Sequence, residues 1–327
     1  MRVVSLVPAG TEIVAALGAT HLLAGVSHEC DWPPAVRSLP RVTATPVDAG
    51  KGSLEIDAQV RELQAAGRPV IAVDGARLAA LEPDLLLVQD LCEVCAVTDG
   101  GIRGIASALS PSTRTLPLAA RDLEGIFRDI LAVGAALGLE TASHMLTAEL
   151  RRRLDALARR EPSRRRRVIC IEWLEPVFLA GHWVPDLIRA AGGEDAGAEP
   201  GSHSVERTLE EVRRLSPDVV LIAPCGFDLE RAERELQAFE ARLRREGREP
   251  PSAWAEVWLL DGNAYTSRPG PRAIEGAELI ASALEGVERP GLRRWAGGGS
   301  RREPVAPAAG GPSSARAEPV ARPADSR

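Results

Sequence analysis

The chain has 327 residues, of which 45% are hydrophobic and 26% are charged, and this composition is typical of a soluble globular protein with room for two lobes. The formal net charge of -6 argues against a general nucleic-acid binder. No stretch of about 18 consecutive apolar residues is present, so we expect no membrane-spanning segment.

The chain opens with a predicted strand, turn and helix. The apolar run at residues 3–7 is typical of a strand buried on both faces. Thr11 precedes the next apolar stretch and Gly18 closes it, so we expect Thr11 to be the N-cap of a helix. Pro8 interrupts the first run too early for a secretion signal. The sequence as written therefore predicts a cytoplasmic protein, or a periplasmic or cell-surface one if its start is assigned too late.

The following part of the chain alternates predicted strands with predicted helices. Strands are expected at residues 23–27, 69–73, 84–88 and 114–116, and helices at residues 53–66, 77–81 and 101–109. Strands that alternate with helices indicate parallel βαβ units with right-handed crossovers. We therefore predict an N-terminal α/β lobe over residues 1–120.

A long helical region separates this lobe from a second one. Residues 122–160 have helical periodicity with an interruption at Gly138, which predicts a rigid connecting helix over residues 121–161. The second α/β lobe is expected over residues 162–290, and a disordered tail rich in Gly, Pro, Ala, Ser and Arg over residues 291–327.

In the second lobe, strands are expected at residues 168–171, 218–222 and 257–260, and helices at residues 184–191, 208–215, 229–245 and 271–284. The predicted fold class is therefore α/β, with two doubly wound lobes joined by a long rigid helix. Ligands of open parallel sheets bind beyond the carboxyl ends of the strands, so we expect a ligand cleft between the lobes.

Several aromatic residues fall in or beside loops that follow predicted strands. Aromatic residues make up only 3% of the chain, yet these loops hold Trp32, Trp173, Trp183 and the single tyrosine, Tyr265. Such side chains can stack on a large planar ligand while their polar group makes a hydrogen bond. They can equally be core residues at the ends of the sheets, because buried Trp is common. The residues alone leave both interpretations open.

Cys92 and Cys95 form a Cys-x-x-Cys pair, and His28 and Cys30 lie two apart on another loop. Thiolate and imidazole ligands at this spacing could bind zinc in a tetrahedral site. A redox pair, or thiols that only line a pocket, are the alternatives. The chain contains no nucleophile elbow, phosphate-binding loop, metalloprotease helix or dinucleotide fingerprint, so we predict no enzymatic activity and no required cofactor.

Five segments resemble, in order, the helical-backbone substrate-binding proteins of ABC importers for vitamin B12 and ferric siderophores. These segments are the opening strand and turn at residues 2–12, the Asp-Trp-Pro-Pro segment at residues 31–34, the two Pro-Asp strands at residues 81–88 and 216–222, and the Gly-Gly-Glu-Asp turn at residues 191–195. The resemblance covers residues 2–290. It is closest to the cobalamin-binding branch, which includes a variant with both Cys-containing loops.

The resemblance implies that a cobalamin-type corrinoid lies between the two lobes, which would move little because a helix connects them. It implies that Trp32 in the first lobe and Trp173 in the second contact this ligand. Arg268 and the loop from Asp261 to Tyr265 would approach the polar groups at its edge.

The resemblance also implies an ABC permease as a partner of a monomeric protein. Glu194 corresponds to one of two carboxylates that dock on the permease, whereas the position of the other is Ala76, with Asp74 as the nearest acid. The alternatives are a ferric-siderophore or haem binder on the same scaffold, or a cytosolic metal- or redox-active protein that uses Cys92 and Cys95.

Overall fold

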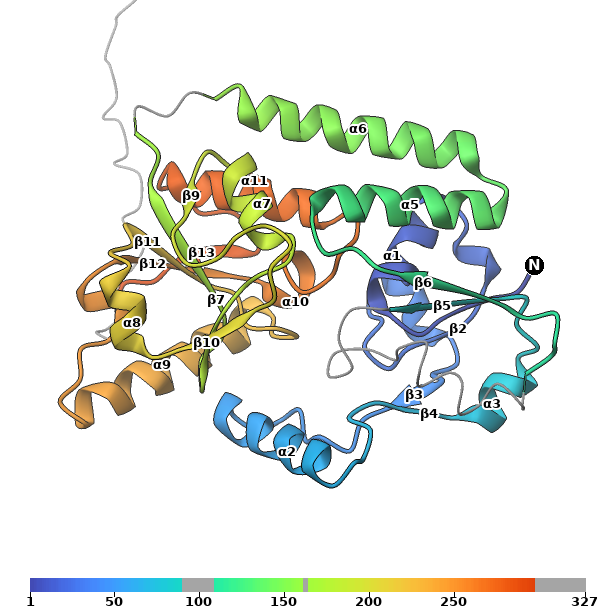
Figure 1. The fold of residues 1–327 in the computed structure, drawn as a ribbon, viewed down its shortest axis with the longest axis horizontal. Helices are drawn as coiled ribbons and strands as arrows, with labels where there is room; N and C mark the ends of the chain where they lie inside the picture. The colour runs from blue at the N-terminus through green and yellow to red at the C-terminus, as the bar shows by residue number, and fades with distance from the viewer. Residues whose placement is uncertain (90–108, 161–163, 298–327) are drawn as a thin grey trace, which may run out of the picture.

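Figure 1 shows the computed structural model, which describes residues 1–89, 109–160 and 164–297. Two α/β lobes lie side by side, and a pair of helices runs along one side of the molecule. The predicted α/β fold class is confirmed. The helix expected at residues 101–109 lies almost wholly outside the described residues.

The N-terminal lobe is built on a parallel four-stranded sheet with the order β2-β1-β5-β6. Its strands are β1 (Val3–Ser5), β2 (Leu23–Val26), β5 (Leu85–Gln89) and β6 (Arg114–Leu118). Successive residues of β5 pack on opposite faces of the sheet, so that Leu85 and Leu87 join one apolar cluster and Leu86 and Val88 join another. This burial on both faces explains the continuous apolar runs in the sequence.

Two predictions for this lobe are wrong. Helix α1 (Pro8–Ala16) begins at Pro8, and Thr11 lies inside it, because proline at the first helical position is preorganised and has no N–H to satisfy. The strand expected at residues 69–73 is reduced to β4 (Ala72–Val73), which pairs antiparallel with β3 (Thr43–Ala44) in a separate ladder. It cannot join the main sheet beside β1, because β2 and β5 already occupy both sides of that strand.

The connection between the lobes is a helical hairpin rather than a single helix. Helix α5 (Leu123–Leu137) contacts α1, and α6 (Glu140–Ala158) runs back along α5 toward the second lobe. Gly138 ends α5 with φ 71°, a left-handed conformation that glycine adopts without strain. Helix α6 therefore carries the chain from one lobe to the other, and α5 also reaches the second lobe, where the backbone N–H of Leu123 donates to Asp186 at 3.1 Å.

The C-terminal lobe has a mixed seven-stranded sheet with a parallel centre. The parallel centre is formed by β7 (Arg167–Trp173), β11 (Val219–Ile222) and β12 (Glu256–Leu260), and the short β9 (Glu194–Asp195) also pairs parallel with β7. Other short strands complete the sheet, namely β8 (Val177–Leu179), β10 (Val205–Arg207) and β13 (Leu292–Arg294). Because β13 pairs with β12, this lobe extends past the boundary predicted at residue 290.

Helices cover both faces of this sheet. The helices of the lobe are α7 (Val184–Ala190), α8 (Leu209–Arg214), α9 (Leu229–Arg245), the short α10 (Gly262–Tyr265) and α11 (Ala273–Leu284). The faces follow the strand alternation, since α7 and α11 share an apolar cluster with Val168 and Cys170, whereas α8 and α9 share one with Ile169 and Ile171. In the first lobe, the short α3 (Gly75–Ala80) covers the face opposite α1.

One apolar core continues from the first lobe into the second on the α6 side. Leu150, Leu154 and Leu157 of α6 belong to the same buried cluster as α1, α5, α7 and α11. Arg153 of α6 adds a bidentate ion pair with Glu278 of α11, at 2.8 and 2.7 Å. This packing fixes the two lobes relative to each other along α6.

The close approach of α5 and α6 gives a stability prediction. A Cβ added to Gly134 would lie 2.3 Å from Cβ and 2.2 Å from Oγ of Ser143. Although Ala is the better helix former, we expect Gly134→Ala to lower the free energy of unfolding by about 1–3 kcal/mol, because the helices must move apart. Urea unfolding measures this loss. Ser143→Gly in the same chain should recover part of it, and an unchanged loss in that double variant would contradict the contact.

Candidate functional site

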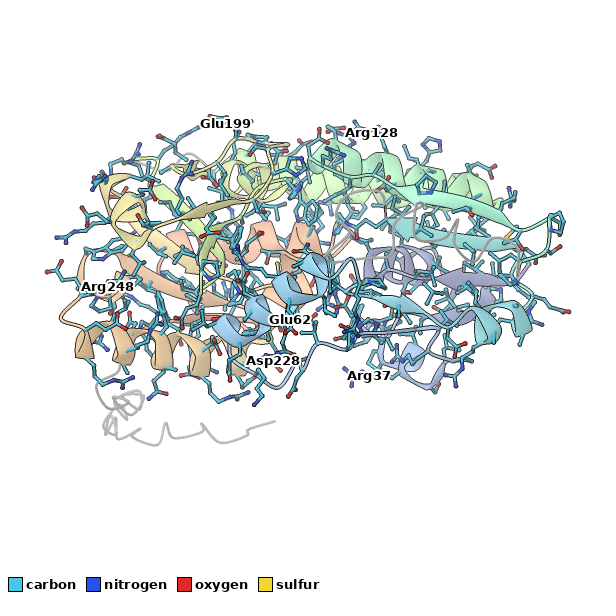
Figure 2. All side chains as sticks on the ribbon, turned by 60° about the horizontal axis from the view of Figure 1, so that its bottom comes forward. Arg37, Glu62, Arg128, Glu199, Asp228 and Arg248 are labelled. Carbon is cyan, nitrogen blue, oxygen red and sulfur yellow. The ribbon has the colours of Figure 1, made fainter. Side chains whose placement is uncertain are left out.

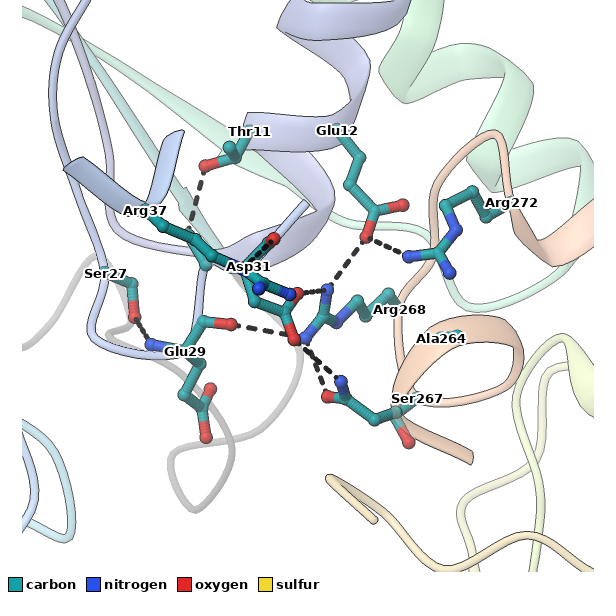
Figure 3. A network of polar contacts seen from close by, with 12 residues as sticks. Thr11, Glu12, Ser27, Glu29, Asp31, Arg37, Ala264, Ser267, Arg268 and Arg272 are labelled. Carbon is teal, nitrogen blue, oxygen red and sulfur yellow. Dashed lines mark hydrogen bonds and ion pairs between the residues drawn. The ribbon is translucent and has the colours of Figure 1, made fainter. Parts of the chain in front are cut away.

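A buried arginine joins the two lobes through polar contacts. Arg268 of the C-terminal lobe is 4% exposed, and its guanidinium donates to Glu12 Oε1 at 2.9 Å and to Asp31 Oδ1 at 2.6 Å (Figure 3). Its other terminal nitrogen donates to Asn263 Oδ1 at 2.7 Å and to the backbone oxygen of Glu29 at 3.2 Å. We call these five residues the Arg268 network. It bridges the lobes on the side of the sheets where functional loops were expected.

The fold places these side chains together because each one follows a strand. Glu12 lies on α1, which begins directly after β1, and Asp31 lies in the loop after β2. Asn263 belongs to α10, which follows β12, and its Nδ2 donates to Asp31 Oδ2 at 3.0 Å. The carboxyl ends of parallel strands therefore face each other across the lobe junction, as predicted for a ligand site.

The acids of the network differ in how readily they take up a proton. Burial raises the pKa of Glu12, although the charges of Arg268 and Arg272 oppose this shift. Burial also raises the pKa of Glu29. Burial alone would raise the pKa of Asp31 as well, but the hydrogen bond and charge of Arg268 outweigh it and hold that pKa below its usual range. Asp31 is thus the most firmly ionised partner of Arg268.

Arg272 contacts both Glu12 of the Arg268 network and two of the predicted aromatic residues. Its guanidinium carbon lies 4.7 Å from the ring centroid of Trp32 and 5.1 Å from that of Tyr265, while its Nη1 lies 3.4 Å from Glu12 Oε1. The Arg272 guanidinium packs against the Trp32 ring, yet Trp32 remains 44% exposed. An accessible indole at the lobe junction is a suitable stacking surface for a planar ligand.

The other two predicted tryptophans have different environments. Trp173 is the last residue of β7 and is half-buried. Its Nε1 donates to the backbone oxygen of Ser53 at 3.2 Å, and its ring meets that of Phe227 edge-on, with the ring centroids 5.4 Å apart. Trp183 is only 5% exposed and donates to the backbone oxygen of Thr266 at 2.9 Å. Trp173 therefore lies where the lobes meet, whereas Trp183 is a core residue in this structure.

The polar residues predicted at the ligand edge are engaged within the protein. Asp261 is the N-cap of α10 and accepts from the backbone N–H of Ala264 at 2.8 Å, and burial raises its pKa. Among the residues that the structure describes, Arg268 donates to the partners of its network. Both residues shape the junction, and their contact with a ligand remains a prediction.

The residues proposed as metal ligands are only partly described. His28 Nδ1 lies 2.6 Å from Thr43 Oγ1, and the Cys30 thiol is 1% exposed. Burial raises the pKa of the Cys30 thiol to about 11. Within the described part of the chain, no group of three or more His, Cys, Asp or Glu residues could hold a metal ion. Cys92 and Cys95 lie outside the described residues, so a zinc site or redox pair there remains a prediction.

The predicted docking residue lies on the surface of the C-terminal lobe. Glu194 is in β9, its side chain is about half exposed, and it pairs with Arg167 at 3.0 Å. Asp74, the acid nearest to the missing second carboxylate, is the N-cap of α3 and accepts from the backbone N–H of Arg77. Docking of a permease at Glu194 remains a prediction.

Two residues of the junction, Glu12 and Arg272, were not predicted from the sequence, whereas Asn263 lies in the predicted loop from Asp261 to Tyr265. Glu12 could have been recognised from the sequence, because it is the only charged residue in the mostly apolar helix α1. Arg272 ends the strand-following loop that also contains Arg268, so its place in a functional loop was visible, but its contact with Trp32 was not.

Comparisons with known proteins agree with this architecture. The family described as "Periplasmic binding protein" matches residues 3–244. The fold is similar to that of a periplasmic haem-binding protein from Pseudomonas aeruginosa, with a TM-score of 0.64 and 20% identity over 90% of this chain and 97% of that chain. It is also similar to the periplasmic vitamin B12 binding protein BtuF of Vibrio cholerae, with a TM-score of 0.56 and 20% identity over 87% of this chain and 96% of that chain.

A third similar structure is the apo form of the periplasmic haem-binding protein RhuT from Roseiflexus sp. RS-1, with a TM-score of 0.63 and 21% identity over 86% of this chain and 97% of that chain. At these identities the likeness shows the fold alone. The comparison with curated proteins gives no match. In the described part of the chain, no helix is both long and apolar enough to cross a membrane.

The Arg268 network predicts a large and pH-dependent loss of stability in one variant. We expect Arg268→Met to lower the free energy of unfolding by about 3–5 kcal/mol at neutral pH, because Glu12 and Asp31 lose the cation between them. The loss should shrink as the pH falls toward about 4, because a buried carboxyl with a raised pKa penalises folding only while it is ionised. Urea unfolding at several pH values measures both effects.

Arg128→Met is the matched control for this variant. Arg128 pairs with Asp122 at 3.4 Å on an exposed surface, so its loss should change stability by less than about 1 kcal/mol. Equal losses in the two variants, or a loss in Arg268→Met that does not change with pH, would contradict the role assigned to the network.

Proposed function

We propose that this chain, which belongs to the periplasmic binding protein family, binds a cobalamin-type corrinoid between its lobes as the substrate-binding component of an ABC importer. The family consists of binding proteins, which agrees with the absence of catalytic motifs in the sequence. The cytoplasmic location expected from the opening residues has no support in this family. We therefore propose that the protein works on the outer side of the membrane, next to its permease.

The observation that carries this proposal is the exposed indole of Trp32 at the lobe junction, packed against Arg272. Arg272 holds one part of this side chain, and 44% of the residue remains accessible. Trp173 stands on the other lobe at the same junction. Large flat macrocycles suit such aromatic surfaces, and the similar structures are described as binders of vitamin B12 or haem, which are both macrocycles of this kind.

The charges at the junction favour a corrinoid over haem or an anionic siderophore. Arg268 and Arg272 both contact carboxylates, so neither guanidinium remains to neutralise the propionates of haem. Four acids belong to the junction around these two arginines, namely Glu12, Glu29, Asp31 and Asp261. The amide groups around a corrin ring carry no charge and can donate hydrogen bonds to such acids.

A titration tests the function. The purified protein is titrated with cyanocobalamin, dicyanocobinamide, haemin and a ferric hydroxamate siderophore, and binding is followed by Trp fluorescence and calorimetry. We expect saturable binding of at least one corrinoid, with haemin binding more weakly. Trp32→Ala should weaken corrinoid binding about tenfold, since aromatic stacking contributes about 0.5–1.5 kcal/mol beyond the buried area.

Trp254→Phe is the control, because Trp254 packs in the apolar cluster beside α8 and α9, away from the junction. It should keep the affinity of the unmodified protein. Tighter binding of haemin or of the siderophore would overturn the corrinoid assignment, and no binding of any of the four compounds would overturn the proposed function.

A further inference from the structure

Helix α2 (Ser53–Ala65) leaves the lobe to which it belongs by sequence. The chain departs from the first lobe through β3 and returns through β4, and within the described part of the chain these two short strands form a separate sheet of their own. The helix lies on the side of the molecule opposite α6 (Figure 1), and a view of that side shows it in front of the junction of the two lobes, with Glu62 on its surface (Figure 2).

The start of α2 is held by polar contacts to the C-terminal lobe. The backbone N–H of Ser53 donates to Glu235 Oε1 on α9 at 2.6 Å, and the backbone oxygen of Ser53 accepts from Trp173 Nε1 at 3.2 Å. Arg231, also on α9, donates to the backbone oxygen of Lys51 at 2.9 Å. Glu235 thus satisfies one of the N–H groups that have no partner within the helix.

These contacts lie on the face of the C-terminal lobe where a ligand is expected. Trp173 ends β7, and Phe227 follows β11 and packs against Trp173. The guanidinium carbon of Arg231 lies 3.6 Å from the centroid of the Phe227 ring. The first residues of α2 therefore occupy a surface formed beyond the carboxyl ends of two central parallel strands.

The attachment of α2 is weaker than the attachment along α6. Within the helix, only Ser53 and Leu63 are buried, and the contact at its other half, between Arg61 and Glu206, is an exposed ion pair at 3.1 Å. Among the described residues, the buried Oγ of Ser53 has no hydrogen-bond partner, which adds a desolvation penalty to the attached position. Segments with few buried apolar contacts are those that open locally at low free energy.

We propose that α2 is a detachable cover of the lobe junction, that Glu235 holds it in place, and that its release exposes the Trp173 surface to the incoming ligand. This inference rests on the proposed function, because it assumes that the ligand lies between the lobes. The lobes themselves stay fixed along α6, so ligand entry needs only the movement of one helix and its two short strands.

Hydrogen–deuterium exchange of the full chain without ligand tests the attachment. Glu235→Ala leaves the Ser53 N–H without its acceptor, so amides of residues 53–65 should exchange about tenfold faster, while those of β7 and β11 stay unchanged. Glu235→Gln keeps an uncharged acceptor and should give an intermediate rate. Glu230 is an exposed acid on α9, the helix that also contains Glu235, so in Glu230→Ala the amides of α2 should exchange at the rate of the unmodified protein.

Stopped-flow Trp fluorescence with cyanocobalamin and dicyanocobinamide then tests the consequence. Association should be severalfold faster in Glu235→Ala than in the unmodified protein and in Glu230→Ala. If Glu235→Ala leaves the exchange in α2 unchanged, or speeds exchange without changing the association rate, α2 is not the cover proposed here. If neither compound binds the unmodified protein or the variants, the proposed corrinoid function fails, whereas the exchange rates still decide whether Glu235 holds α2.

Discussion

The guanidinium of Arg268 is removed from water at the lobe junction, and its charge is tolerated there because two carboxylates of the other lobe contact it directly. The same contacts fix the loop after β2 and the loop after β12 relative to each other. Glu12 also contacts Arg272, whose guanidinium packs on the exposed ring of Trp32. The position of the stacking surface therefore depends on this charge cluster.

The two sides of the lobe junction are stabilised in different ways. Along α6, leucine side chains continue one apolar core from lobe to lobe, and separation of the lobes there would expose it to water. On the opposite side, α2 contributes mainly polar contacts at its first residue and at Arg61. Hydrogen bonds and exposed ion pairs can be exchanged for contacts with water, so this side opens at a lower free energy.

The parts of the fold that the sequence predicted well are those in which local pattern and burial agree. The strands near Val88 and Ile222 are apolar on both faces, and they form the buried centres of the two sheets. Thr11 was misjudged because Pro8 starts the helix earlier. The contact between Glu12 and Arg268 joins residues 256 positions apart, and no local pattern encodes such a pair. Trp32 and Trp183 both lie in or beside loops that follow strands, and the sequence does not show which of them is accessible. The packing of the folded protein leaves Trp32 exposed and buries Trp183.

The excursion from β3 through α2 to β4 has an evolutionary consequence. It begins and ends at a small ladder of its own, so insertions, deletions and substitutions within it leave the strand order of both parallel sheets unaltered. Surface segments of this kind diverge faster than the elements that support them. The proposed cover of the lobe junction can therefore change in length or composition without redesign of either lobe.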